Sequence, residues 1–94
     1  MNRTTIRIPT PLRSFTGGAG EVSVEAATVG DALHALGRSH EGILERVLDS
    51  EGRIRGFVNI YVGETNVKSL GGLGAAIPAS AVISIVPAVA GGGP

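Results

Sequence analysis

Few side chains in this 94-residue sequence have the types and spacing that chemistry at a side chain requires. Cysteine is absent, which excludes thiol catalysis, thiolate zinc sites and disulfides. His34 and His40 have a spacing that does not put both on one helical face, and no further ligands accompany them, so we expect no metal site. Any sulfur chemistry must therefore take place away from a side chain.

Two glycine-rich stretches remain as candidates. "LGGLGAA" (70–76) lacks the lysine and the Ser/Thr of a phosphate-binding loop and has no strand-turn-helix context, so it predicts a turn-rich crossover. The second stretch is "PAVAGGGP", from Pro87 to Pro94, in which Gly91–Gly93 precede a proline. Taken alone, such a run is more often a disordered tail or a cloning remnant than a functional site.

The composition narrows the class of protein. The chain is long enough for one domain, and its eight basic and eight acidic residues leave no basic field for nucleic acid. Its aromatic residues, Phe15, Phe57 and Tyr61, are too few for a base-stacking platform. No apolar stretch reaches the about 18 residues of a membrane span, and the start lacks the apolar core of a signal peptide. We therefore expect a cytoplasmic protein without nucleic-acid or membrane partners.

The first third of the chain changes from the period of a strand to that of a helix. Ile6 and Ile8 alternate with Arg7, and "EVSVE" (21–25) resumes the alternation after the turn residues of "TPLRSFTGGAG" (10–20), which predicts a β-hairpin. Thr28 and Asp31 then have the spacing of a helix N-terminal cap. Apolar residues follow at positions 29, 32, 33 and 36, so we expect an amphipathic helix.

The remainder of the chain predicts two further strands. The helical face continues through residue 48, with an interruption expected at Gly37 and Gly42. "IRGFVNIYV" (54–62) predicts a strand with apolar residues on both faces, so Phe57 and Tyr61 are candidate partner-binding residues. The alternative is that they pack in the core or on the sheet surface. An irregular crossing with one short helical turn (64–80) leads to a last strand, "AVISIVP" (81–87).

This order of elements predicts an α+β fold. One main helix lying across a mixed sheet of four to five strands is the economical way to bury the apolar stripe of the helix. That arrangement is the β-grasp, or ubiquitin-like, fold. We expect the β-grasp domain to occupy residues 1–87 and a flexible tail to occupy residues 88–94.

Four segments in this order resemble one family. They are "IPTPLRSFTGG" (8–18), "TVGDALHAL" (28–36), "RIRGFVNIYV" (53–62) and "VISIVPAVAGG" (82–92). Together they are similar to the ubiquitin-like sulfur carriers, the family of the molybdopterin-synthase small subunit (MoaD) and the thiamine sulfur carrier (ThiS). The resemblance runs from Ile6 to Gly92 and is greatest to the CysO-type branch, which supplies sulfur for cysteine synthesis.

The resemblance implies that the protein is a substrate of other enzymes rather than an enzyme. A ubiquitin-activating-type adenylyltransferase (MoeB/ThiF-like) uses ATP to adenylate the carboxylate of Gly92, and a sulfurtransferase step gives a thiocarboxylate. The sulfur passes to a sulfur-accepting synthase in cysteine, molybdopterin, thiamine or natural-product biosynthesis, and the carrier itself binds no cofactor. Gly91 and Gly92 fit a narrow channel because they lack Cβ, and the small Val89 and Ala90 follow as partner contacts.

The family pattern ends at Gly92, whereas this chain continues with Gly93 and Pro94. A terminal proline is bulky and restricted in φ, so it does not suit the activating site. Some relatives carry a short extension that a zinc-dependent JAMM-type metallopeptidase removes, and we expect Gly93 and Pro94 to be removed in the same way. A competing register removes Pro94 alone and leaves Gly93 as the acyl residue.

Two alternatives stay open. In one variant of the sulfur-carrier hypothesis, the protein is the small subunit of molybdopterin synthase. The second hypothesis belongs to a different functional class: the protein is a ubiquitin-like protein modifier, or a non-covalent binding module that acts through its sheet face. Lys68 is the only lysine that such a modifier has as a target in this chain. Deleting Gly91 and Gly92 separates the classes, because a surface-only module tolerates the truncation.

Overall fold

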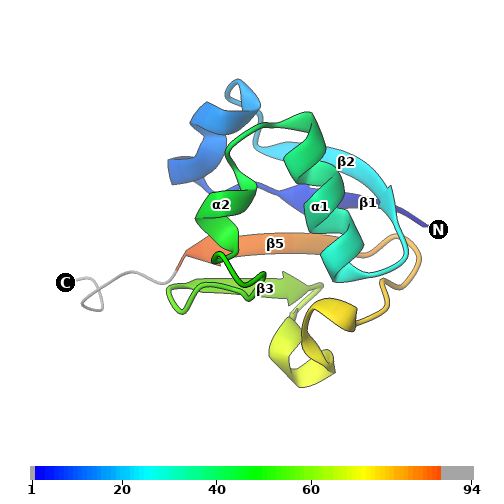
Figure 1. Cartoon of the computed structure of the whole chain (residues 1–94). Helices are drawn as coiled ribbons and strands as arrows, with labels where there is room; N and C mark the ends of the chain where they lie inside the picture. Colours follow the sequence, from blue (N-terminus) through cyan, green and yellow to red (C-terminus); the bar gives the residue numbers. More distant parts are fainter. Residues whose placement is uncertain (1, 88–94) are drawn as a thin grey trace.

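Five strands form one mixed sheet in the computed structural model of this chain, which describes residues 2–87. The strands are β1 (Asn2–Arg7), β2 (Glu21–Ala26), β3 (Val58–Val62), β4 (Thr65–Asn66) and β5 (Val82–Pro87). Their order across the sheet is β2-β1-β5-β3-β4, which puts the last strand of the sequence at the centre (Figure 1). β5 runs parallel to β1 and antiparallel to β3. The predicted α+β, β-grasp fold is confirmed.

The β1–β2 hairpin pairs antiparallel, as its alternation predicts. Ile6 and Ile8 are buried, whereas Arg7 is exposed. The connection between the strands is more regular than a turn, because Thr10–Thr16 form the 3-10 helix η1. Pro11 lies at its start and Gly17, with a φ of 67°, caps its end. Proline just inside the start and glycine just past the end are typical of a helical segment.

Two helices cover one side of the sheet (Figure 1). α1 (Val29–Ser39) begins where the Thr28 hydroxyl accepts a hydrogen bond from the Asp31 N–H at 3.2 Å, so the predicted cap is confirmed. The interruption predicted at Gly42 is also confirmed: its φ is 92°, and α2 (Leu44–Val47) follows it. The interruption predicted at Gly37 is wrong. Gly37 lies inside α1, and a Cβ there would come within 3.1 Å of Leu44, so this glycine lets α2 pack closely against α1.

The core lies between α1 and the sheet. The helix contributes the predicted stripe, and each of the three middle strands contributes a fully buried isoleucine: Val29, Ala32, Leu33, Leu36, Ile6, Ile60 and Ile83. The Thr4 hydroxyl, buried at the same layer, donates a hydrogen bond to the Ala81 carbonyl at 2.6 Å. The sheet therefore has one covered face and one open face.

The crossing that leads to β5 is built from short elements. β4 is followed by the 3-10 helices η2 (Val67–Leu70) and η3 (Gly72–Gly74), where one helical turn was expected. "LGGLGAA" lies within this crossing, which confirms its interpretation as a turn-rich crossover. The crossing brings the chain to the start of the central strand.

Candidate functional site

The root of the glycine-rich tail is anchored in the centre of the sheet. β1 pairs with Val82–Ser84 and β3 pairs with Ile83–Pro87, so the last residues of β5 are paired on the β3 side. Ile83 and Ile85 are 0 % and 3 % exposed, which fixes the strand to the core. The last described residue, Pro87, is therefore firmly held by the sheet.

The predicted chemistry falls on residues beyond this point. The residues predicted to form the acyl terminus, to be processed or to contact partners in the tail lie outside the described residues: Gly91, Gly92, Gly93, Pro94, Val89 and Ala90. The predicted tail, 88–94, lies outside them too. Their roles stay predictions, and the described site is the surface from which the tail departs.

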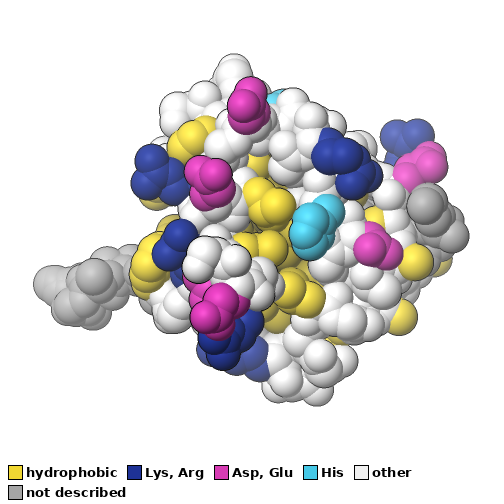
Figure 2. All heavy atoms as spheres, viewed as in Figure 1, with side chains coloured by type: hydrophobic (Ala, Val, Ile, Leu, Met, Phe, Trp, Pro, Cys, Tyr) yellow, Lys and Arg dark blue, Asp and Glu magenta, His cyan; other side chains and the backbone are white. Residues whose placement is uncertain are grey.

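A groove of about 680 Å³ lies beside the root of the tail. We call it the root groove. Its lining comes from η1, from α2, from the loop before β3, from the first residue of β3 and from the end of β5: Pro11, Leu12, Ser14, Phe15, Glu45, Arg46, Arg55, Phe57, Val58, Ile85 and Pro87. Hydrophobic and basic side chains lie together at this end of the molecule (Figure 2).

The two predicted partner-binding aromatic residues lie in different places. β3 begins only at Val58, whose N–H donates to the Arg55 carbonyl at 3.0 Å, so Phe57 sits in a turn before the strand. Phe57 is 56 % exposed and lines the root groove. Tyr61 is half-buried within β3, opposite Ser84, and does not line the groove. Phe57 is therefore not a core residue, and its role in binding a partner stays a prediction.

One wall of the root groove depends on a contact between distant parts of the sequence. The Phe15 ring of η1 lies against Gly42, where a Cβ would come within 3.1 Å of the ring atom Cε1. The Arg46 guanidinium lies over the same ring, 5.5 Å from its centroid, which is within the range of a cation–π interaction. Phe15 thus joins η1 to α2 and holds Arg46 in place.

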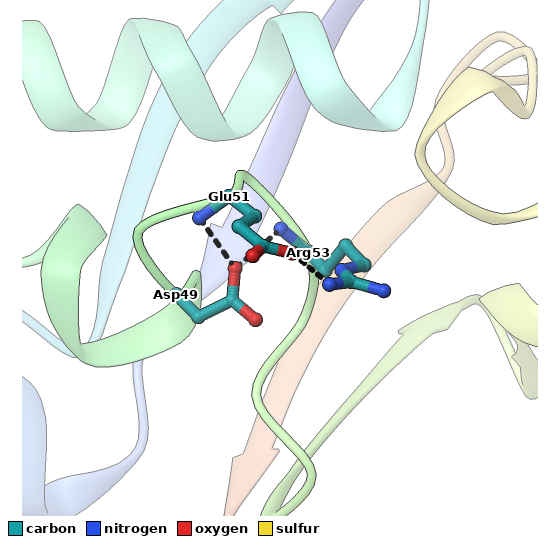
Figure 3. A network of polar contacts seen from close by, with 3 residues as sticks. All are labelled: Asp49, Glu51 and Arg53. Carbon is teal, nitrogen blue, oxygen red and sulfur yellow. Dashed lines mark hydrogen bonds and ion pairs between the residues drawn. The ribbon is translucent and has the colours of Figure 1, made fainter.

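The opposite wall is set by the loop between α2 and β3. Asp49 Oδ1 accepts hydrogen bonds from the N–H groups of Glu51 and Arg53 at 2.9 and 3.0 Å, and the side chains of Glu51 and Arg53 form an ion pair (Figure 3). After this turn the Arg55 N–H donates to the Val47 carbonyl at 3.0 Å. The loop therefore presents Arg55 and the adjoining Phe57 in a defined arrangement.

The arginines of the root groove have no acidic partner within residues 2–87. Arg55 Nε donates to the backbone carbonyl of Glu45 at 2.9 Å, and no carboxylate lies within ion-pair distance of Arg46 or Arg55 in this part of the chain. The open sheet face differs, because Arg3 there pairs with Glu25 at 3.4 Å. The root groove therefore combines apolar surface with two arginines that form no ion pair within the described residues and one carboxylate, that of Glu45.

Other kinds of site find no support in the described residues. Across residues 2–87, no group of three His, Cys, Asp or Glu side chains is placed to hold a metal ion. His34 is exposed, and its Nδ1–H donates to the Gly30 carbonyl at 2.8 Å. Within the same range, no helix has the length and apolar character needed to span a membrane.

The sequence patterns did not predict the root groove. One wall is formed where η1 packs against α2. The contact between Phe15 and Arg46 joins residues far apart in the sequence, and the local pattern of apolar residues cannot predict such a contact. Pro11 and Gly17 mark η1 as a helical segment and were the available signal for one wall. That Arg46 and the exposed Phe57 line one groove appears only in the folded chain.

Comparison with known proteins gives consistent results. The ThiS family matches residues 6–92, the range over which the sequence motifs predicted a resemblance. The sulfur carrier protein CysO of Mycobacterium tuberculosis (strain ATCC 25618 / H37Rv) is 44 % identical over 90 residues, which cover 94 % of this chain and 97 % of that protein.

Two further relatives share most of this chain. A chain in the crystal structure of the Amycolatopsis orientalis BexX/CysO complex superposes with a TM-score of 0.88 at 38 % identity, over 95 % of this chain and 99 % of that one. Small archaeal modifier protein 3 of Haloferax volcanii is 33 % identical over 66 residues, which cover 70 % of this chain and 71 % of that protein.

Proposed function

The chain belongs to the ThiS family and is a small sulfur carrier, and we propose that it holds sulfur as a thiocarboxylate on Gly92. The observation that carries the proposal is the extent of the family match, which ends at residue 92, on the second glycine of the pair Gly91–Gly92. The 44 % identity to a sulfur carrier protein over nearly the whole chain supports it. In this role the protein is a substrate of other enzymes.

The proposed chemistry needs no side chain of the carrier. A carboxylate oxygen of Gly92 attacks the α-phosphorus of ATP, and pyrophosphate leaves. The persulfide of a sulfurtransferase then attacks the carbonyl carbon, and AMP leaves with the bonding oxygen. A thiol reductant cleaves the resulting acyl disulfide and leaves the thiocarboxylate on Gly92. ATP is bound by the ubiquitin-activating-type adenylyltransferase, so the carrier needs no cofactor of its own. A chain without cysteine suits this chemistry, because the sulfur is held at the backbone terminus.

The anchored root of the tail supports the proposal physically. A fully extended backbone from Pro87 to Gly92 spans at most about 17 Å. The reactive carbon can therefore enter a partner's active site only if that partner contacts the surface around Pro87. Because β5 is fixed in the core through Ile83 and Ile85, binding to that surface also orients the tail.

We propose that Gly93 and Pro94 are removed before activation. The family match stops before these two residues, and a terminal proline at position 94 would block a channel that accepts only glycine. A JAMM-type metallopeptidase that cuts after Gly92 supplies the required terminus. The competing register, with Gly93 as the acyl residue, predicts a product one glycine longer.

The proposed destination of the sulfur is a synthase that receives the tail. CysO of Amycolatopsis orientalis is found in a complex with BexX, which shows that a similar carrier assembles with a second protein. The similarity to CysO proteins favours the cysteine or natural-product branch over the role of a molybdopterin-synthase small subunit. In each branch the carrier is regenerated with a free carboxylate after the sulfur is transferred.

A second candidate function is conjugation to proteins. It is favoured by the 33 % identity to small archaeal modifier protein 3, whose name states that role for the relative. The same adenylated Gly92 would then be attacked by a lysine amine, and AMP would leave as an amide forms. A carrier without conjugating activity gives only the thiocarboxylate, so the two functions differ in product.

The order of steps can be tested by intact mass spectrometry. The full chain is incubated with the peptidase, the adenylyltransferase, the sulfurtransferase, a sulfur source and ATP, with the peptidase omitted from a parallel sample. We expect the loss of a Gly-Pro dipeptide followed by the exchange of one oxygen for sulfur, with neither change when the peptidase is omitted. Efficient adenylation of the chain that still ends in Pro94 would contradict the processing step.

A chain truncated after Gly92 is the matched control. It should be adenylated and loaded with sulfur whether or not the peptidase is present. A chain truncated after Ala90 should accept neither AMP nor sulfur. If the chain ending at Gly93 is loaded as efficiently as the chain ending at Gly92, the proposed register is wrong.

A further inference from the structure

We propose that the root groove is the docking site for an acidic segment of the adenylyltransferase, one that also presents an aromatic or aliphatic side chain. The inference rests on the proposed function, because it assumes that Gly92 enters that enzyme. It assigns a surface of this chain, and a chemical character of the partner, to the encounter that precedes adenylation.

The position of the root groove makes contact with the enzyme unavoidable. Ile85 and Pro87 line the groove, and the tail begins immediately after Pro87. An extended tail places Gly92 within about 17 Å of Pro87, so an enzyme that encloses Gly92 also approaches the groove. The adenylyltransferase is the partner that every loading cycle requires, and it is therefore the occupant to which the proposal commits.

The apolar part of the root groove suits a single inserted side chain. Phe57 is 56 % exposed, although it is one of only three aromatic residues in the chain. Leu12 and Phe15 are half-buried on the opposite side of the groove. An aromatic or aliphatic side chain inserted between them would remove this surface from water, which is how interface hot spots gain most of their affinity.

The charges of the root groove require an acidic partner. Arg46 and Arg55 line it together with one carboxylate, that of Glu45, and no ion pair joins either arginine to a carboxylate within residues 2–87. The Phe15 ring orients the Arg46 guanidinium. The bond from Arg55 Nε to the Glu45 carbonyl leaves the two terminal NH₂ groups of Arg55 to face a second molecule. Such a pre-oriented fork matches a carboxylate in a bidentate geometry.

Charge reversal tests the electrostatic half of the proposal. The chain ending at Gly92 is prepared as Arg46→Glu, as Arg55→Glu and as the double variant, with Arg38→Glu as the matched control on the exposed surface of α1. Calorimetry gives the Kd for the adenylyltransferase, and ATP–pyrophosphate exchange gives the rate of adenylation. We expect the double variant to raise Kd by about tenfold or more and to weaken its salt dependence, while Arg38→Glu changes Kd by less than about twofold.

Truncation of an exposed side chain tests the apolar half. Phe57→Ala is compared with Leu70→Ala, because Leu70 is 43 % exposed on η2 and does not line the root groove. We expect Phe57→Ala to raise Kd by at least about fivefold and Leu70→Ala to leave it unchanged. Thermal unfolding followed by circular dichroism checks that both variants fold.

The outcomes separate the docking proposal from the proposed function. If the chain that ends at Gly92 and carries no other change supports no pyrophosphate exchange, the carrier role proposed for Gly92 fails. If it supports exchange and the groove variants match their controls, the docking proposal alone is overturned. The docking proposal is also overturned if the groove variants are adenylated normally but fail to pass sulfur to the acceptor.

Photo-crosslinking identifies the segment that docks. A benzophenone amino acid replaces Phe57 in the chain that ends at Gly92, and Leu70 is replaced in a control sample. We expect the first sample alone to crosslink, to a peptide of the adenylyltransferase that contains Asp or Glu beside an aromatic or aliphatic residue. A crosslink from position 57 to a basic peptide would overturn the proposal.

Discussion

The β1–β2 hairpin and the root groove each carry two arginines, and they use them differently. On the hairpin, Arg3 lies opposite Glu25 and Arg7 lies opposite Glu21, so the register of the two strands pairs both charges within the chain. In the root groove, Arg46 and Arg55 have no such partner among residues 2–87.

This difference locates recognition on the surface of the molecule. The charges of the hairpin are compensated locally and need no second protein. Those of the root groove lie beside Pro87, the last described residue, and beside the exposed ring of Phe57. Arg38 also lacks an ion-pair partner within residues 2–87, but the docking proposal rests on the two arginines that line the groove beside Pro87.

Deleting residues 91–94 should give the largest effect, because it removes the proposed site of sulfur loading and leaves the root groove in place. A chain that lacks residues 91–94 should keep its unfolding midpoint, because the described fold ends at Pro87, yet it should accept no sulfur in the mass assay. The root groove of this truncated chain should still bind the adenylyltransferase. Normal activity of the truncated chain in vivo would instead favour a binding module that acts only through its surface.

Removing the support beneath the root should reduce stability strongly. Ile83 is 0 % exposed in the central strand and does not line the root groove, so we expect Ile83→Ala to lower the free energy of unfolding by about 2–5 kcal/mol. Val86→Ala is the control in the same strand, because Val86 is 41 % exposed, and its effect should stay within about 0.5 kcal/mol. Urea unfolding measures both, and equal losses would contradict the placement of the core.

Gly42 tests how the groove wall is built. Gly42→Ala should lower the free energy of unfolding by about 1–3 kcal/mol, because φ is 92° and the new Cβ would lie 3.1 Å from the Phe15 ring. Gly52→Ala is the matched control, with a φ of 83° and open space around it, so it isolates the backbone strain. Gly42→Ala should also weaken binding to the adenylyltransferase more than Gly52→Ala does. Identical behaviour of the two variants would show that the contact with Phe15 does not shape the groove.

The hairpin should give the smallest effect. Arg3 and Glu25 are 72 % and 60 % exposed, so Arg3→Ala should change the free energy of unfolding by no more than about 1 kcal/mol. Its Kd for the adenylyltransferase should equal that of the unaltered chain. A loss of affinity as large as that of Arg55→Glu would remove the distinction between the two regions.

The sequence predicted those parts of the fold that local periodicity controls. The Thr28 cap, the stripe from Val29 to Leu36 and the alternation of Ile6 with Arg7 each report which face of an element is buried. Gly37 was misinterpreted because a glycine inside a helix has the same appearance in sequence as one that ends it. Only the approach of Leu44 in the folded chain explains its presence.

The sequence singles out the diglycine, whose role stays a prediction, and it does not reveal the root groove. The diglycine and its position after β5 can be recognised from the sequence, because both depend only on the order of residues along the chain. The root groove is assembled from four separate segments of the sequence. The sequence pattern predicted Phe57 inside the strand 54–62, but the turn that begins at Arg55 places it before the strand. Tertiary contacts of this kind leave no period in the sequence.

The position of the transferred sulfur tests the central claim most directly. Lys68 is the last basic residue, so trypsin releases the whole C-terminal segment as one peptide that begins at Ser69. After loading, tandem mass spectrometry of this peptide should place a single sulfur on the terminal carbonyl carbon of Gly92, with no Gly93 or Pro94 attached. A sulfur-bearing peptide that still ends in Pro94, or a loaded chain whose sulfur lies elsewhere, would contradict the account.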